Sequence, residues 1–125
     1  KRAIFRWYRQ RLSGLQGVAL NAEPAGVVNS YWMVTIVPDA SFGLDKFEIM
    51  DELNKRNIDS RPFFSRLSDL QAFDDRPASK RFVRADERGA EIARCGVNLP
   101  SGYNMDEAKV DIVAAAVKEI FGARA

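Results

Sequence analysis

The chain has 125 residues, of which 46% are hydrophobic and 29% charged, and its formal net charge is +2. These values are typical of a folded domain with a hydrophobic core, and the net charge is too small to indicate a nucleic-acid partner. The chain has no histidine and one cysteine, which excludes the usual zinc sites, a histidine general base and an internal disulfide.

The sequence also argues against a membrane partner. The longest apolar run, residues 31–37, stops at Pro38 and is far shorter than the roughly 20 residues that cross a bilayer. The lone Cys95 is typical of a reducing compartment. We therefore expect a cytoplasmic protein.

An amphipathic helix is predicted at the start of the chain. Apolar residues recur there at helical spacing, and the basic residues between them are expected to face solvent. The helix is expected to end near Ser13 and Gly14. Its apolar positions are Ile4, Phe5, Tyr8, Leu12 and Leu15.

A strand is predicted over residues 31–37, after an irregular connection over residues 17–26. The strand segment is rich in aromatic and β-branched residues and is almost continuously apolar. This pattern indicates a strand that is buried on both faces or central in its sheet.

A second helix is predicted after Asp45, because Glu48 three residues later completes a capping box. Asn57 is expected to take a left-handed conformation where this helix ends. A short strand is predicted over residues 58–60, and Pro62 keeps Arg61 extended. The apolar positions of the helix are Phe47, Met50 and Leu53.

Residues 65–94 have a helical tendency, and residues 97–100 are predicted to form a short strand or extended turn. Asn104, with Glu107 three residues later, is expected to cap a final helix that ends at Gly122. The expected buried residues of the first stretch are Leu67, Leu70, Phe73, Phe82 and Val83. Those of the final helix are Val110, Val113, Ala114, Val117 and Phe121.

This element order predicts one α/β domain of the α+β type over residues 1–125, with helices packed on a small sheet in two or three layers. The chain contains no internal repeat or flexible linker. Because it does not begin with methionine, we expect it to be a segment of a longer protein.

Arg61 is the strongest candidate for a functional residue. Pro62 holds it on an extended segment, where its guanidinium can bind a carboxylate or phosphate through two hydrogen bonds. A structural salt bridge to Asp59 or Asp69 explains it equally well. Strand alternation would turn one of Phe63 and Phe64 inward and the other toward a ligand.

Other polar and aromatic residues are weaker candidates. Tyr31 and Trp32 lie at the entrance of the predicted strand, where core packing is the favoured role. Asn98 and Ser101 flank a tight loop and are better candidates than the remaining capping residues.

Three ordered motifs together resemble the C-terminal domain of the DegT/DnrJ/StrS family of pyridoxal-phosphate-dependent nucleotide-sugar aminotransferases. They are Asn29-Ser30-Tyr31-Trp32-Met33, then Ile58-Asp59-Ser60-Arg61-Pro62-Phe63-Phe64 with Leu67-Ser68, then Val97-Asn98-Leu99-Pro100-Ser101-Gly102. The resemblance covers essentially the whole chain. It implies the small C-terminal domain of a fold type I aminotransferase, which closes over a larger N-terminal domain.

The resemblance also implies the activity and the partners. Such enzymes move an amino group from glutamate to a nucleotide-linked keto sugar, and the full-length enzyme is expected to be a homodimer with no nucleic-acid partner. The missing N-terminal domain would supply the lysine that binds pyridoxal phosphate. None of the chain's six lysines matches that lysine, so we expect this segment to bind no cofactor and to be inactive alone.

The site residues carried over by the resemblance are Arg61 and Phe64, with Tyr31 as a third candidate, all for substrate binding; we expect no catalytic, cofactor-binding or metal-binding residue. The Arg-Pro-Phe-Phe run resembles perosamine-synthase-like members, which implies a 4-keto-6-deoxy sugar. Ser65-Arg66 departs from the common pattern of an aromatic residue and a proline before Leu67. The alternative function is a stand-alone module that binds an anion or single-stranded nucleic acid through Arg61, Phe63 and Phe64.

Overall fold

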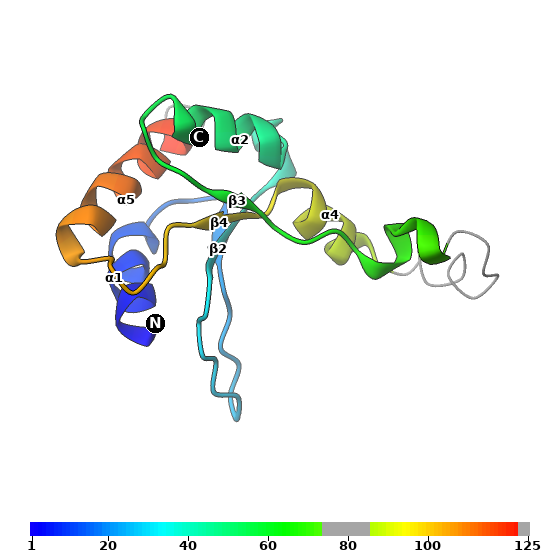
Figure 1. Ribbon diagram of the computed structural model, residues 1–125, viewed down its shortest axis with the longest axis horizontal. Coiled ribbons are helices and arrows are strands. Elements are labelled where there is room, and N and C mark those ends of the chain that lie inside the picture. Colours follow the sequence, from blue (N-terminus) through cyan, green and yellow to red (C-terminus); the bar gives the residue numbers. More distant parts are fainter. Residues whose placement is uncertain (74–85, 123–125) are drawn as a thin grey trace.

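The computed structural model describes residues 1–73 and 86–122 (Figure 1). Its helices are α1 (Arg2–Leu12), α2 (Lys46–Asn54), α4 (Glu87–Cys95) and α5 (Glu107–Gly122). Its strands are β1 (Val18–Leu20), β2 (Val34–Pro38), β3 (Arg61–Pro62) and β4 (Val97–Leu99). Short 3-10 helices cover Ala40–Phe42, Leu67–Asp69 and Gln71–Phe73.

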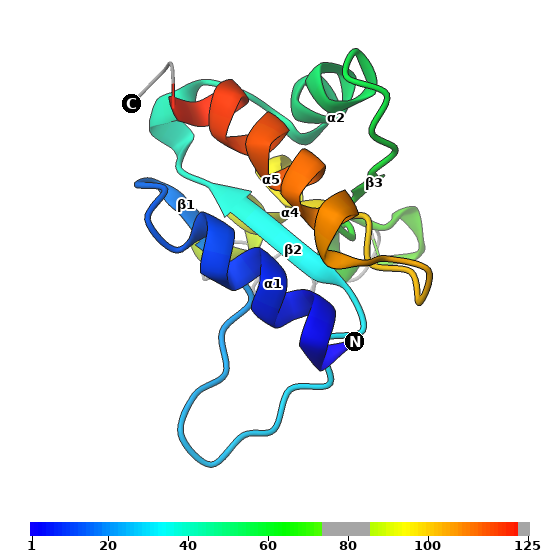
Figure 2. The same cartoon turned by 90° about the vertical axis from the view of Figure 1, so that its left-hand side faces the viewer.

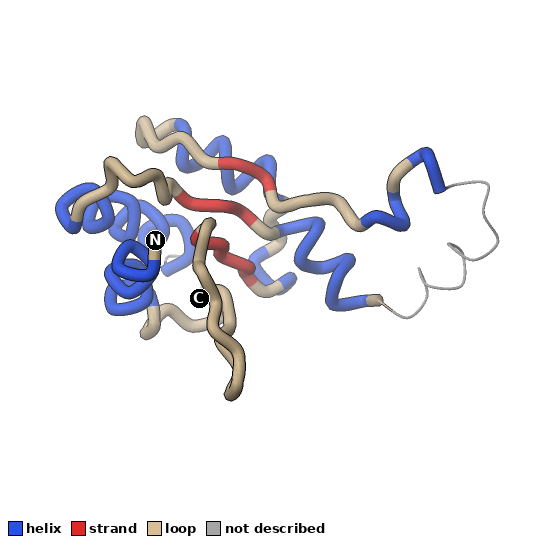
Figure 3. The backbone as a smooth tube through the Cα atoms, turned by 60° about the horizontal axis from the view of Figure 1, so that its bottom comes forward, coloured by secondary structure: helices blue, strands red, loops and turns tan. Residues whose placement is uncertain are grey.

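The strands form one antiparallel sheet in the order β1-β2-β4-β3. Figure 3 shows strands of this sheet, in red, side by side. Ile36 on β2 lies opposite Leu20 on one side and Val97 on the other. Arg61 on β3 lies opposite Asn98 on β4. The last strand in the sequence therefore lies inside the sheet, between two strands that precede it.

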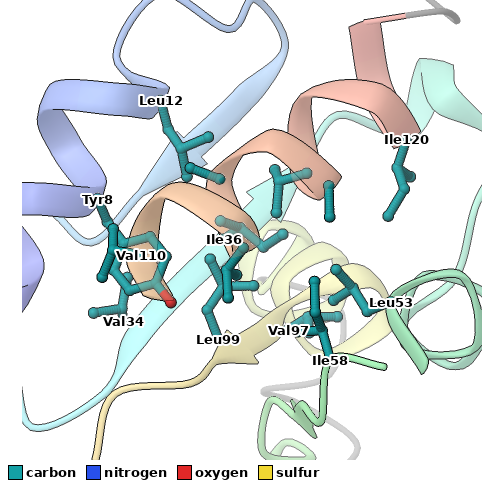
Figure 4. Close-up of a cluster of buried hydrophobic side chains, with 14 of the residues drawn as sticks. Tyr8, Leu12, Val34, Ile36, Leu53, Ile58, Val97, Leu99, Val110 and Ile120 are labelled. Atoms are coloured by element: carbon teal, nitrogen blue, oxygen red, sulfur yellow. The ribbon is translucent and has the colours of Figure 1, made fainter. Parts of the chain in front are cut away.

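Helices α1 and α5 cover one face of the sheet, and α4 lies behind the other face (Figure 2). The covered face is apolar because alternate residues of β2 and β4 point toward the two helices. Figure 4 shows the resulting cluster, which includes Tyr8, Leu12, Val34, Ile36, Val97, Leu99 and Val110. Burying one such large apolar side chain stabilises the fold by about 1.5–3 kcal/mol. The predicted α+β domain, with helices packed on a small sheet, is confirmed.

The capping box predicted at the start of α2 is confirmed. The Asp45 carboxylate accepts hydrogen bonds from the backbone N–H groups of Phe47 and Glu48, and Glu48 accepts one of 2.8 Å from Asp45 N. Asn57 has the predicted left-handed backbone, with φ of 59°. Phe47, however, is exposed, and Ile49 and Leu53 form the buried side of the helix.

Two predicted element starts were wrong. Strand β2 begins at Val34 and excludes Tyr31, because Tyr31 has a left-handed backbone, with φ of 48°, that cannot continue a strand. Helix α5 begins at Glu107, and Asp106 rather than Asn104 accepts the capping hydrogen bond, from Lys109 N at 2.9 Å.

Two predicted connections also differ. The expected irregular segment contains β1, and the expected strand over residues 58–60 is displaced to Arg61–Pro62. Leu67 and Leu70 were expected to be buried but are exposed. Phe82 and Val83 lie outside the described residues. No helix in the described part of the chain is long and apolar enough to span a membrane.

Candidate functional site

A cleft of about 380 Å³ lies where β3 and the end of β4 meet the segment that enters β2. It brings together residues from all three sequence motifs. Its lining residues are Lys1, Trp32, Met33, Asp59, Ser60, Arg61, Asn98, Leu99, Pro100 and Ser101.

Arg61 is held at this cleft by the backbone of β3. The strand is fixed at Arg61 by the register with Asn98, and after it by a 2.9 Å hydrogen bond from Phe63 N to Gly96 O. Asn98 Nδ2 adds a 3.3 Å hydrogen bond to Pro62 O. The expectation that Arg61 lies on an extended, anchored segment is confirmed.

The Arg61 guanidinium is 73% exposed and pairs with Asp59. Its Nη1 and Nη2 lie 3.2 and 3.1 Å from the two Asp59 carboxylate oxygens. Exposed pairs of this kind are weak and are screened by salt. A carboxylate or phosphate of a ligand can therefore replace Asp59 on the same two donors.

Two buried polar side chains, those of Thr35 and Asn98, lie next to Arg61 across the sheet. Thr35 Oγ1 donates a 2.7 Å hydrogen bond to Asn98 Oδ1. Directly paired residues in an antiparallel sheet point to the same face, so Thr35, Asn98 and Arg61 lie on one side. Asn98, one of the weaker sequence candidates, thus supports Arg61 and also lines the cleft.

One aromatic ring, that of Trp32, lines the cleft, and the Phe64 ring stacks with it. Trp32 and Phe64 are nearly parallel, with an angle of 11° between the ring planes and 6.3 Å between the ring centroids. Trp32 is 59% exposed and Phe64 is 57% exposed. Phe63 is partly buried, as strand alternation predicted, but the expectation of a core role for Trp32 was wrong.

Tyr31 is not part of this cleft. Its ring stacks on Phe5 at 3.6 Å, and its hydroxyl donates a 3.1 Å hydrogen bond to Glu23. It lines a second pocket, of about 310 Å³, with Arg2 and Arg9. Trp32 therefore lines the cleft with Arg61 and stacks with Phe64, whereas Tyr31 packs against α1.

Glu23 holds the segment that carries Tyr31. It pairs with Arg2 at 2.7 Å and accepts a 2.9 Å hydrogen bond from Asn29 N. These contacts lower the pKa of Glu23 to about 2. The hydrogen bond from the Arg2 guanidinium has the largest effect, and the hydrogen bond from Asn29 N–H has the second largest. Burial, followed by the hydrogen bond to Glu23, raises the pKa of Tyr31.

Two further residues of the cleft lie at its rim. The Lys1 ammonium donates a hydrogen bond to the Ser101 carbonyl oxygen. Lys1 thus places a second positive charge on the same cleft as Arg61, although no sequence motif singled it out. Ser101, one of the weaker sequence candidates, also lines the cleft.

The described lysines lack the burial that activates a Schiff-base lysine. A lysine that forms a Schiff base is activated by burial or by a neighbouring cation. In residues 1–73 and 86–122 no lysine is buried, and Lys55 and Lys109 are paired with carboxylates. The same residues contain no group of three or more cysteine, aspartate or glutamate side chains that could hold a metal ion.

The model of the DegT/DnrJ/EryC1/StrS aminotransferase family matches residues 1–118. The chain belongs to this family. The resemblance seen in the three motifs is thereby confirmed over almost the whole chain.

Curated relatives match the same span. EpsN of Bacillus subtilis (strain 168), provisionally assigned as a pyridoxal phosphate-dependent aminotransferase, is 32% identical over 124 residues, which are 97% of this chain and 30% of EpsN. GDP-perosamine synthase of Vibrio cholerae is 28% identical over 121 residues, which are 97% of this chain and 32% of that protein. The chain therefore spans about a third of the length of these relatives.

Solved structures share the fold at lower identity. The aminotransferase TlmJ from Streptoalloteichus hindustanus matches with a TM-score of 0.72 and 21% identity, over 98% of this chain and 31% of that chain. DesI, solved with its TDP-sugar product, matches with a TM-score of 0.74 and 21% identity over the same shares.

Proposed function

We propose that this chain is the C-terminal small domain of a pyridoxal-phosphate-dependent aminotransferase that acts on a nucleotide-linked keto sugar. The observation that carries the proposal is the family match over residues 1–118 together with the Arg61 cleft. Two similar proteins support the substrate class, because GDP-perosamine synthase is named for a nucleotide sugar and DesI was solved with its TDP-sugar product. In the reaction, glutamate becomes 2-oxoglutarate as the keto group of the sugar becomes an amino group.

The chain's own part in this reaction is to bind and orient the substrate. Arg61 offers two parallel N–H donors to an anionic group, and such a fork suits a phosphate or carboxylate. Phe64 lies beside the cleft and would contact the same ligand. Tyr31 acts indirectly, because it positions the segment that carries Trp32 and does not itself line the cleft.

The lysine and the cofactor belong to a separate N-terminal domain in this proposal. Pyridoxal phosphate supplies the electron sink for moving the amino group once it is bound there. The described lysines support this division, since none is buried. We further propose that the complete protein is a cytoplasmic homodimer and that the segment alone is inactive. The lone buried thiol of Cys95 is consistent with a reducing compartment.

The resemblance of the Arg-Pro-Phe-Phe run to perosamine-synthase-like members, which implies a 4-keto-6-deoxy sugar, is supported by GDP-perosamine synthase, which matches 97% of this chain. Stand-alone nucleic-acid binding has no comparable support. Arg2, Arg11 and Arg56 are each paired with a carboxylate, that of Glu23, Asp111 and Glu119 respectively.

The test is an assay of the complete polypeptide that contains this chain. It would be incubated with pyridoxal phosphate, glutamate and a GDP-linked 4-keto-6-deoxy sugar, and 2-oxoglutarate would be measured. We expect 2-oxoglutarate and the amino sugar in equal amounts, and none from the 125-residue chain alone. A complete polypeptide that fails with GDP-, UDP- and TDP-linked keto sugars would overturn the proposal.

A further inference from the structure

Two exposed aromatic rings beside a pair of cations require an explanation. Trp32 and Phe64 come from segments 32 residues apart and nevertheless lie nearly parallel, while more than half of each side chain faces solvent. Phe63 packs edge-on against Phe64, with 5.6 Å between the ring centroids and 65° between the ring planes, which restrains the Phe64 ring. The pair is therefore an ordered apolar surface rather than two unrelated surface residues.

The backbone turns Trp32 outward at a cost. Tyr31 has a left-handed backbone, which is unfavourable for a bulky aromatic residue. Stacking on Phe5, the hydroxyl hydrogen bond to Glu23 and a 2.8 Å hydrogen bond from Tyr31 N to Asn29 Oδ1 hold it there. The consequence is that Tyr31 turns inward and Trp32 turns into the cleft.

The cleft combines this aromatic surface with positive charge. Trp32, Arg61 and Lys1 line the same cavity. An aromatic face accepts any nucleobase by stacking, and arginine and lysine accept a phosphate chain. A nucleoside diphosphate carries both features in one molecule.

We propose that Trp32, supported by Phe64, is the surface on which the nucleobase of a nucleoside diphosphate stacks, with Arg61 and Lys1 facing the diphosphate. The inference rests on the proposed function and deepens it by dividing the cleft into a base end and a phosphate end. Stacking is tolerant of the base, so this surface sets affinity for a nucleotide rather than a choice between guanine and uracil.

The test measures binding to the complete polypeptide by calorimetry, with GDP, UDP and inorganic pyrophosphate as probes. Trp32→Leu is expected to weaken GDP and UDP binding by about ten-fold, which lies within the measured range for loss of base stacking on an aromatic side chain. Pyrophosphate binding is expected to stay unchanged. Trp32→Phe keeps a ring and is expected to recover most of the lost affinity.

Phe47→Leu is the matched control, because Phe47 is 62% exposed and lies on α2 outside the cleft. It is expected to leave all three affinities unchanged. Equal GDP affinity in wild type and Trp32→Leu would overturn the inference, as would a loss confined to the KM of the sugar-linked substrate, which would place the hexose on Trp32. A lowered melting temperature or altered dimerisation with unchanged GDP affinity would instead assign Trp32 to a protein interface.

The same experiment separates this inference from the proposed function. If the complete polypeptide forms no 2-oxoglutarate but loses GDP affinity in Trp32→Leu, the function is wrong and the stacking surface stands. If turnover occurs and Trp32→Leu binds GDP normally, the function stands and the stacking surface is wrong.

Discussion

Thr35 on β2 donates a 2.7 Å hydrogen bond from its hydroxyl to the side-chain oxygen of Asn98 on β4, and both residues are buried. Asn98 in turn donates to Pro62 O on β3. A side chain two strands away from Arg61 therefore helps to fix the strand that carries it.

We expect Thr35→Val to lower the free energy of unfolding by about 1–3 kcal/mol, because Asn98 Oδ1 loses its donor while it stays buried. Urea denaturation measures this loss. Thr35→Ser keeps the hydroxyl and loses one methyl group, so we expect a loss of only about 0.8 kcal/mol. Equal losses in the two variants would contradict a stabilising role for the hydrogen bond.

Arg61→Lys in the complete polypeptide should raise the KM for the nucleotide sugar about ten-fold, because lysine keeps the charge but loses the two parallel donors. The melting temperature should not change, since the side chain is largely exposed. Steady-state kinetics and a thermal melt measure the two effects.

Arg88→Lys provides the control for this substitution. Arg88 is also an exposed, paired arginine, bound to Glu91 on α4, and it does not line the Arg61 cleft. Its kinetics should match wild type. An Arg61→Lys variant with unchanged KM for the nucleotide sugar would remove Arg61 from the substrate site.

Glu23 should make the fold sensitive to acid. Its folded pKa of about 2 lies below the unfolded value of about 4.3, so its stabilising effect is present above the unfolded pKa and is lost as the pH falls toward the folded pKa. Glu23→Gln should therefore be less stable than wild type at neutral pH.

The stability difference between wild type and Glu23→Gln should be constant above about pH 5 and should shrink between about pH 5 and pH 2. Urea denaturation at a series of pH values measures it. A difference that does not change over that interval would show that Glu23 gains nothing from its charge in the folded state.

Gly96→Ala should destabilise the sheet by about 1–3 kcal/mol, as overpacking does. An added Cβ would lie 2.5 Å from Ile92 O and 2.8 Å from Phe63 Cβ, so α4 or the chain after β3 must move. Substrate affinity should fall as well, because that chain leads directly from Arg61. Chemical denaturation and the KM are the two measurements.

Gly14→Ala serves as the comparison for Gly96→Ala. An added Cβ at Gly14 meets nothing within 4 Å, so its stability should stay within about 0.5 kcal/mol of wild type. If Gly14→Ala and Gly96→Ala lost equal stability, the close approach of Ile92 O and Phe63 to Gly96 would not be the cause.

Features set by neighbouring residues could be predicted from the sequence. The capping box of Asp45 and Glu48 and the left-handed Asn57 depend on a few adjacent residues, and both were predicted correctly. Strand β1 was missed because three residues are too few for a periodic signal, and its pairing depends on β2. The start of β2 was misplaced because contacts with Phe5 and Glu23 hold Tyr31 out of the strand.

In the candidate site, too, features set by neighbouring residues could be predicted, and features set by distant contacts could not. The extended backbone of Arg61 was predictable because Pro62 restricts it locally. Trp32 was not, because strand alternation from Val34 and Ile36 would turn it toward the core, and the left-handed Tyr31 interrupts that alternation. Its exposure could be found only from the folded chain.

The position of β4 inside the sheet sets an order of events during synthesis. When β2 and β3 have left the ribosome, neither has its partner on the inner side, because that partner is residues 97–99. The segments that carry Trp32 and Arg61 are then not yet paired through β4, so the cleft that they line has not formed. The Arg61 cleft thus forms in one late step. A chain that stops before β4 would expose two unpaired strand edges for aggregation.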